Sequence, residues 1–258
     1  MPLPADQLTG IEDVRMEALP LLDFVKSWGY EVSDALISNW IKASGVELER
    51  LCQRTFVPKR ATEWYDGNDQ TTLVVRRYPI IKVHKCRIYG GRHFLIWEFP
   101  EDKIVYEGRH TDKQYQQAEL LVRGEIGELV ITLGLLEWFQ PMRMRPPLFI
   151  WNRRFVQGIQ NIEVDYTAGF GFYDENGNLW AEPPYEVQRA VTLLTCIKLA
   201  NWAGLIGGNV SSRSLGDRSE SYGGGSPFAA AVQRWRQELF GDGRAPGLVD
   251  RLRTIYAR

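Results

Sequence analysis

The clearest pattern in the chain is a helical one that begins after Ser33. Apolar residues recur there at the spacing of three and four that places side chains on one face of a helix. Ser33 suits the N-cap position because its hydroxyl can accept a hydrogen bond from a free backbone N–H. The pattern predicts a helix to about Arg54, before an extended run that ends in Pro58. The predicted apolar face consists of Ile37, Trp40, Ile41, Leu48, Leu51 and Cys52, with the small Ser44 beside them.

A second helical pattern follows Pro183 and Pro184, and prolines suit the first turn of a helix. It extends to about Gly204. Its shared face carries Val187, Ala190, Val191, Leu194, Ile197 and Asn201. We expect this face to pack against the apolar face that follows Ser33. Shorter helices are predicted over residues 19–28, 227–240 and 248–257.

The segment between these helices, residues 61–182, has the pattern of β structure. Glycine, proline and asparagine turn signals interrupt it, for example at Gly90-Gly91 and at 176–178. Short β-branched and aromatic runs lie between the turns. These runs, residues 71–75, 80–89, 103–106, 129–133 and 162–166, predict strands with mostly antiparallel pairing.

The chain is therefore expected to be an α+β protein, with an α-helical bundle formed by both chain ends and an inserted, enlarged antiparallel β region. Residues 1–60 and 183–258 would form the helical domain, and residues 61–182 the β domain. The Gly- and Ser-rich segment 207–226 is expected to be a long mobile loop.

Charge and cysteine content narrow the classes of function. The net charge is −1, without the basic excess that proteins usually carry when they bind the phosphates of nucleic acids. The three cysteines, Cys52, Cys86 and Cys196, lie far apart and form no C-x-x-C pair, so they indicate neither a disulfide framework nor a zinc site. Cys52 and Cys196 lie in apolar helical stretches, where buried thiols are common. No apolar run is long enough to predict a membrane span.

Motifs for catalysis are weak. Ser219-Glu220-Ser221-Tyr222-Gly223 resembles a nucleophile elbow, but the first glycine is missing and no strand is predicted before it. His84, His93 and His110 show no metal-ligand spacing. Glu163 and Asp165 alternate with apolar residues, which is typical of the solvent face of a strand, although a carboxylate pair that converges only in space stays possible.

One basic run is a candidate for nucleic-acid binding. Aromatic residues interleave with its arginines, as in surfaces that stack bases and hold phosphates. The alternative is a charged hairpin surface or a contact with a neighbouring subunit, which the near-neutral net charge favours. The run consists of Arg143, Arg145, Phe149, Trp151, Arg153 and Arg154.

Three stretches, in this order, resemble the head-to-tail connector (head-completion adaptor) family of tailed bacteriophages. Residues 39–67 resemble the family's helix with its Cys-x-Arg-x-Phe-like ending, held here by Cys52, Arg54 and Phe56, and then its strand and "YDG"-like turn. Residues 161–170, NIEVDYTAGF, are similar to its strand before a proline and a long helix. Residues 214–225, SLGDRSESYGGG, resemble its loop before the terminal helices. The region between Gly67 and Asn161 is longer than its counterpart in the family.

This resemblance implies a structural virion protein and no enzyme. Family members form a cyclic homo-oligomeric ring, usually of about twelve copies, at the head–tail junction. Such a ring binds the portal protein on one side and a stopper or tail protein on the other. It extends the channel for genomic DNA without sequence-specific binding, needs no cofactor or metal, and contacts no membrane. The protein would be made in the host bacterial cytoplasm.

Two sets of residues are candidate contact sites within this interpretation. The last helix is expected to dock on the portal, because it is too short to be stable alone and carries an apolar stripe beside arginines. Its candidate residues are Leu248, Arg251, Leu252, Arg253, Ile255 and Tyr256. The alternative is that this helix folds back on its own bundle. The third motif is a candidate assembly loop, with Leu215, Gly216, Asp217, Ser219, Ser221 and Tyr222.

A β-rich binding module for a receptor or a carbohydrate is the rival interpretation, in which residues 61–182 carry the function. A hydrolase is a weaker third. The size of the native assembly separates the first two, because a binding module would be a monomer or a trimer.

Overall fold

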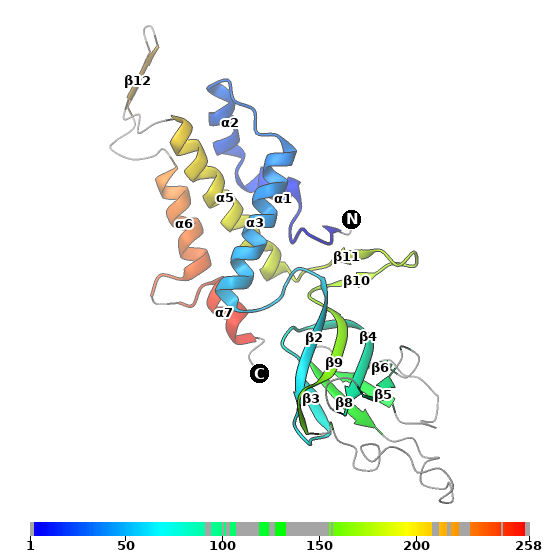
Figure 1. Cartoon of the computed structure of the whole chain (residues 1–258). Coiled ribbons are helices and arrows are strands. Elements are labelled where there is room, and N and C mark those ends of the chain that lie inside the picture. The colour runs from blue at the N-terminus through cyan, green and yellow to red at the C-terminus, as the bar shows by residue number, and fades with distance from the viewer. Residues whose placement is uncertain are drawn as a thin grey trace, which may run out of the picture. The chain divides into compact units, whose positions relative to one another are not determined.

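The chain forms two compact units in the computed structural model (Figure 1). Met1–Val57 and Phe172–Arg258 form the helical unit, and Pro58–Gly171 form the β unit. The α+β class predicted from the sequence is confirmed. The structure describes residues 3–90, 94–99, 101, 104–106, 119–123, 127–132, 155, 157–207, 212–215, 218–221, 228–243 and 245–255.

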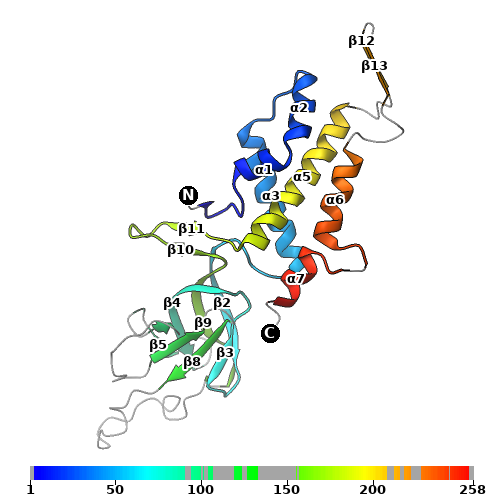
Figure 2. The ribbon, with the colours of Figure 1, turned by 180° about the vertical axis from the view of Figure 1, so that it is seen from behind.

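The helical unit is arranged around one long central helix, α5 (Tyr185–Gly207), which the other helices contact (Figures 1 and 2). Helix α6 lies on one flank of α5, with α1 and α3 on the other. The bounds of these helices are α1 (Ile11–Glu17), α2 (Leu19–Ser27), α3 (Asp34–Cys52), α6 (Ala229–Phe240) and α7 (Leu248–Ile255). Two short strands, β10 (Gly171–Tyr173) and β11 (Leu179–Ala181), form a small sheet with β1 (Leu3–Pro4).

Helix α3 begins as its sequence predicts. The Ser33 hydroxyl accepts a hydrogen bond from the Leu36 N–H at 3.3 Å, which confirms the predicted N-cap. The helix ends at Cys52, two residues before the predicted end, because Gln53 takes a left-handed conformation with φ 55°. Helix α1 was not predicted, because residues 11–17 carry few apolar side chains. The Asp13 carboxylate accepts from the Gly10 N–H at 3.2 Å and so helps to close its first turn.

The predicted faces of α3 and α5 lie in the core of the helical unit and the two helices contact each other. Ile37, Ile41 and Leu48 are fully buried on α3, as are Val187 and Val191 on α5. Burying each such side chain contributes about 1.5–3 kcal/mol. Trp40 was expected in this core, but it is only half-buried and packs edge-on against Trp202, with ring centroids 5.5 Å apart.

The β unit contains two four-stranded sheets that share one core. The first has the order β2-β9-β4-β5, and the second has the order β3-β8-β7-β6. Every pair is antiparallel except β6 with β7, which is parallel. The strands are β2 (Lys59–Gly67), β3 (Thr72–Val74), β4 (Ile80–Tyr89), β5 (Leu95–Phe99), β6 (Ile104–Tyr106), β7 (Glu119–Arg123), β8 (Glu128–Thr132) and β9 (Gly158–Ala168).

A buried tyrosine pair fixes the β unit where β2 and β9 meet the segment after β3. The Tyr65 and Tyr166 hydroxyls lie 3.0 Å apart, and both donate to the Glu63 carboxylate. Backbone N–H groups of Arg76 and Arg77 donate to these two hydroxyls, at 3.0 and 3.2 Å. Burial and the Glu63 carboxylate raise the pKa of Tyr65 to about 12 and raise that of Tyr166 as well. The network is therefore fully hydrogen-bonded, as a buried polar cluster must be to be stable.

Strand β9 shows where alternation alone misleads. Ile162, Val164 and Tyr166 are fully buried, as the alternating pattern predicts. The prediction of a solvent face for Glu163 and Asp165 is wrong, because both carboxylates are covered. Asp165 is 4% exposed and accepts two hydrogen bonds from Arg60, at 2.9 and 2.7 Å. Glu163 accepts from the Tyr89 hydroxyl at 2.8 Å.

The segment expected to be a mobile loop contains a hairpin in its described part. Strands β12 (Ser212–Leu215) and β13 (Arg218–Ser221) pair antiparallel in a sheet of their own. Serine and arginine dominate these strands, so neither β propensity nor apolar alternation marks them in the sequence.

The Asp165–Arg60 pair predicts a pH-dependent stability. The two Arg60 hydrogen bonds lower the pKa of Asp165 against the opposing effect of burial. Its contribution is thus present above the unfolded-state pKa of about 3.9 and is lost as pH falls through the lower folded-state pKa. We expect Asp165→Asn to cost about 1–2 kcal/mol at pH 7 and clearly less near pH 3, measured by urea unfolding. The exposed Glu175→Gln is the control. A cost that stays constant over this pH range would contradict the assignment.

Candidate interaction surfaces of the helical unit

Arg189 joins three helices of the helical unit. From α5 it donates two hydrogen bonds to Glu238 on α6, at 2.7 and 3.0 Å, and one to Glu17 on α1, at 2.7 Å. The Trp235 indole N–H of α6 donates to the same Glu17 carboxylate at 2.7 Å. Burial would raise the pKa of Glu17, but Arg189 and Trp235 lower it below its usual range. We call this group, with Arg234 at 3.5 Å from Glu17, the Arg189 cluster.

Helix α7 lies against α3, α5 and α6 of its own unit. Leu248, Val249 and Leu252 are between 1% and 4% exposed. The Arg253 guanidinium donates two hydrogen bonds to the Leu51 carbonyl, at 2.8 and 2.7 Å, next to the end of α3. Such a carbonyl has no partner within its helix and attracts a cation. The arrangement is the fold-back that the sequence left open as an alternative.

The residues proposed from the sequence for portal docking therefore divide into groups. Leu248 and Leu252 belong to the core of the helical unit, and Arg253 closes the end of α3. Arg251 is exposed and can meet a partner. The Ile255 side chain and Tyr256 lie outside the described residues.

The candidate assembly loop corresponds to the β12–β13 hairpin. Its register places Leu215 opposite Arg218, Ser219 opposite Ser214, and Ser221 opposite Ser212. Gly216, Asp217 and Tyr222 lie outside the described residues. A single two-stranded ribbon is marginally stable in water, so a partner surface would stabilise this one.

The cysteines and His84 are held in the fold. Cys52, Cys86 and Cys196 are free and buried, and burial raises their pKa values to about 11, 12 and 12. A thiol with so high a pKa is a poor nucleophile at neutral pH. The His84 ring lies 3.0 Å from the Thr167 hydroxyl, and burial lowers its pKa.

The remaining sequence candidates lie outside the described residues. These are His93, His110, and the basic run with Arg143, Arg145, Phe149, Trp151, Arg153 and Arg154. The described part of the chain holds no group of three His, Cys, Asp or Glu side chains that could bind a metal ion. Within that same part, no helix has the length and apolar character needed to cross a membrane.

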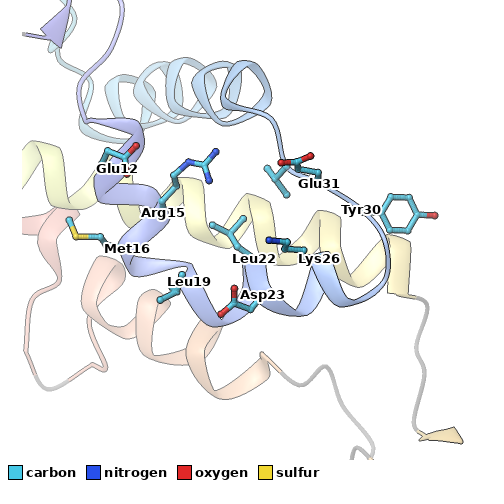
Figure 3. A pocket seen from close by; sticks show the side chains of 10 residues that line it. Glu12, Arg15, Met16, Leu19, Leu22, Asp23, Lys26, Tyr30 and Glu31 are labelled. Carbon is cyan, nitrogen blue, oxygen red and sulfur yellow. The ribbon is translucent and has the colours of Figure 1, made fainter. Parts of the chain in front are cut away.

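An exposed apolar surface lies on α1, α2 and the segment that joins α2 to α3 (Figure 3). Met16, Leu19 and Tyr30 are 70%, 55% and 50% exposed there. They line a cavity of about 390 Å³, within the size range of pockets that accept a ligand or a side chain. The opposite face of α2 is buried through Leu21 and Val25, so α2 is held in place from behind. The α1–α2 surface is lined by Glu12, Arg15, Met16, Leu19, Leu22, Asp23, Lys26, Tyr30, Glu31 and Val32.

The α1–α2 surface lies in an acidic part of the chain. Residues 1–34 contain seven acidic and two basic residues, a net charge of −5, whereas the whole chain has −1. Arg15 is paired with Asp34, with its Nε 3.2 Å from that carboxylate. Within the described residues, Glu12, Asp23 and Glu31 form no ion pair. Lys26 lines the same cavity, so these three carboxylates and Lys26 together leave a net negative charge around the apolar side chains.

The other end of the chain carries the opposite charge. Residues 228–258 contain six basic and three acidic residues, a net charge of +3. On α6, Arg236 and Phe240 are both exposed and lie four residues apart, hence on one face of the helix. Phe240 is 48% exposed, and we call this pair, with the exposed Gln233 and Gln237, the α6 surface.

Sequence reasoning did not find these two surfaces. An apolar side chain that stays exposed cannot be told from a core residue by its identity, so Met16, Leu19 and Phe240 carry no signal of their own. The segregation of charge between the two chain ends was present in the sequence and points to both surfaces.

The Arg189 cluster predicts a large stability effect. Arg189→Met would leave the Glu17 and Glu238 carboxylates without their main partner. We expect it to lower the free energy of unfolding of the helical unit by about 2–3 kcal/mol, measured by urea unfolding. The exposed Arg50→Met on α3 is the control, with a change within about 0.5 kcal/mol. Equal effects of the two variants would contradict a structural role for the cluster.

The position of α7 predicts a contrast between two neighbouring residues. Leu252→Ala should cost about 2–5 kcal/mol because it removes a buried side chain. Arg251→Ala should change the melting temperature little because this side chain is exposed. An α7 that docked only outside its own unit would give the reverse result, a nearly unchanged melting temperature for Leu252→Ala.

Comparison with known proteins gave matches among solved structures only. No protein-family model matches the chain, and no curated protein matches it significantly. One similar structure is a chain from the neck of an empty GTA particle computed with C6 symmetry. It is 16% identical with a TM-score of 0.37, and the match covers 89% of this chain and 93% of that chain. Another is from the neck of a native GTA particle computed with C12 symmetry, 17% identical with a TM-score of 0.32, covering 89% and 92%.

Proposed function

We propose that this chain is a structural virion protein of a tailed bacteriophage, the subunit of the adaptor ring between the portal and the tail or stopper. The observation that carries the proposal is the ordered set of three connector-like motifs together with the contacts of the first two. The first motif follows α3 into β2, and the second is β9 with its continuation through the prolines into α5.

The first two motifs pair with each other although about a hundred residues separate them. Strand β2 pairs with β9 in a register that places Lys59 opposite Ala168 and Tyr65 opposite Ile162. The motif residues also have definite structural roles. Phe56 is fully buried, and its N–H donates to the Glu49 carboxylate at 2.7 Å. The residues that carry the resemblance thus lie beside the two points where the chain passes between the helical unit and the β unit.

A ring of this kind performs no chemistry, and its physical task is to hold neighbours around a channel. The chain supplies surfaces for contact in its exposed apolar side chains and separated charges. Its near-neutral net charge suits a channel wall, since DNA would slide past without the affinity that comes from counterion release. In this proposal the ring stands at the head–tail junction of the virion, contacts the portal above and a stopper or tail protein below, and works without a cofactor.

The portal contact is proposed for the outer side of α7 and the chain after it. The Arg251 side chain is exposed, so it can pair with carboxylates of a portal. Leu248 and Leu252 would support this surface from behind by fixing α7 on α3 and α6. The hairpin with Leu215, Ser219 and Ser221 is a second proposed contact, since partner strands would stabilise it.

The mass of the native assembly tests the proposed function. Native mass spectrometry of the purified chain is expected to give a closed ring of about twelve copies. In a separate centrifugation experiment, this ring should sediment together with portal-bearing heads. A monomer or trimer that does not bind the heads would overturn the proposal and favour the β-rich binding module. The variant Arg251→Glu should weaken sedimentation with heads while leaving the mass of the ring unchanged.

A further inference from the structure

We propose that the ring closes by a head-to-tail contact in which the α6 surface of one copy binds the α1–α2 surface of the next copy. This inference rests on the proposed function, because it names the partner of the α1–α2 surface as a second copy of the chain. The exposed Phe240 of one copy would occupy the cavity beside Met16 and Leu19 of its neighbour.

Charge is the first argument for this pairing. The α1–α2 surface belongs to a segment of net charge −5, and the α6 surface to a segment of net charge +3. Glu12, Asp23 and Glu31 outnumber Lys26 and the paired Arg15 around the cavity, whereas Arg236 lies one helical turn from Phe240. Opposite potentials on two different surfaces of one chain are complementary between copies and speed their encounter.

Charge also disfavours the symmetric alternative. In a twofold dimer the same surface meets itself, so the three carboxylates of one α1–α2 surface would face three of the other, with one Lys26 on each side to offset them. Like charges placed opposite one another across an interface disfavour the complex strongly. A contact between two different surfaces removes this repulsion, and such contacts form rings when the rotation between copies closes.

Apolar exposure is the second argument. Met16 and Leu19, at 70% and 55% exposure, and Phe240, at 48%, are large apolar side chains that the isolated chain leaves in water. An aromatic anchor that enters a pocket is the usual centre of a protein interface, with charged residues at its rim. Figure 3 shows the α1–α2 surface with that composition, apolar side chains between charged ones.

The positions of the two surfaces within the helical unit are the third argument. Helix α6 buries Trp235 and Leu239 and exposes Phe240, whereas α1 directs Glu17 toward Trp235 of α6 and exposes Met16. A head-to-tail contact requires two surfaces on different sides of the subunit, so that each copy can bind two neighbours at once. The Arg189 cluster fixes α1 and α6 to the same central helix, and it therefore sets the geometry between the two surfaces.

Charge-reversal variants test the contact by native mass spectrometry over a range of protein concentrations. Asp23→Arg with Glu31→Arg reverses the α1–α2 surface, and Arg236→Glu with Gln237→Glu reverses the α6 surface. Each pair alone is expected to raise the concentration at which half of the chain is assembled by about tenfold or more. All four changes together, or an equal mixture of the two variants, should restore assembly because opposite charges face each other again.

An apolar pair of variants gives an independent test with a matched control. Met16→Ser with Leu19→Ser, or Phe240→Ser, should weaken assembly while leaving the melting temperature of the dilute chain nearly unchanged, because these side chains are exposed. Val46→Ser on α3 is the control, since Val46 is apolar and 64% exposed but lies on neither surface, and it should assemble as the parent chain does.

The results separate this inference from the proposed function. Parent chain that forms a ring, together with surface variants that assemble as well as the parent, would overturn the head-to-tail contact and leave the adaptor function standing. Loss of assembly in both charge variants without recovery in the mixture would also overturn it. Parent chain that stays monomeric, alone and on portal-bearing heads, would overturn both.

Discussion

The helical unit depends on a single guanidinium, that of Arg189. The unit is assembled from segments that lie far apart in the chain, with α1 and α3 before the β unit and α5, α6 and α7 after it. The burial of apolar surface around α5 drives the association of the helices but is itself not directional. The paired hydrogen bonds from Arg189 to Glu238 and its bond to Glu17 are directional, and they fix α6 and α1 on the central helix. The β unit can therefore be inserted between α3 and α5 while the two chain ends still form one body.

This arrangement has a consequence for assembly. Both surfaces that we assign to the contact between copies lie on helices that Arg189 holds, α1 at the acidic end and α6 at the basic end. A ring of identical subunits needs the same rotation at every contact, so the angle between the two surfaces of one subunit must be well defined. The Arg189 side chain, which is 24% exposed and bonded to two carboxylates, defines such an angle better than apolar side chains alone, since apolar packing adapts to small shifts.

The sequence predicted the fold class and most regular elements, but it predicted the contact surfaces poorly. Helix α3 and strand β4 were predicted almost to the residue, because apolar periodicity, an N-cap serine and turn glycines agree there. Helix α1 and the β12–β13 hairpin were missed, since polar residues dominate both.

The surroundings of single side chains were harder to predict than the elements. Asp165 was expected to face solvent because an alternating pattern shows on which face of a strand a residue lies, but not whether Arg60 covers that face. The last helix was expected to dock on another protein because it is short, whereas Leu248 and Leu252 are buried in the core of their own unit. Exposed apolar residues such as Met16 look like core residues until the fold is known.

A density map of the assembled neck, obtained by cryo-electron microscopy of particles that contain this chain, tests the account most directly. We predict a closed ring in which each helical unit contacts its neighbour through α6 on one side and α1–α2 on the other, with Phe240 beside Met16 and Leu19. Copies that meet only through their β units, or a chain located away from the head–tail junction, would contradict it.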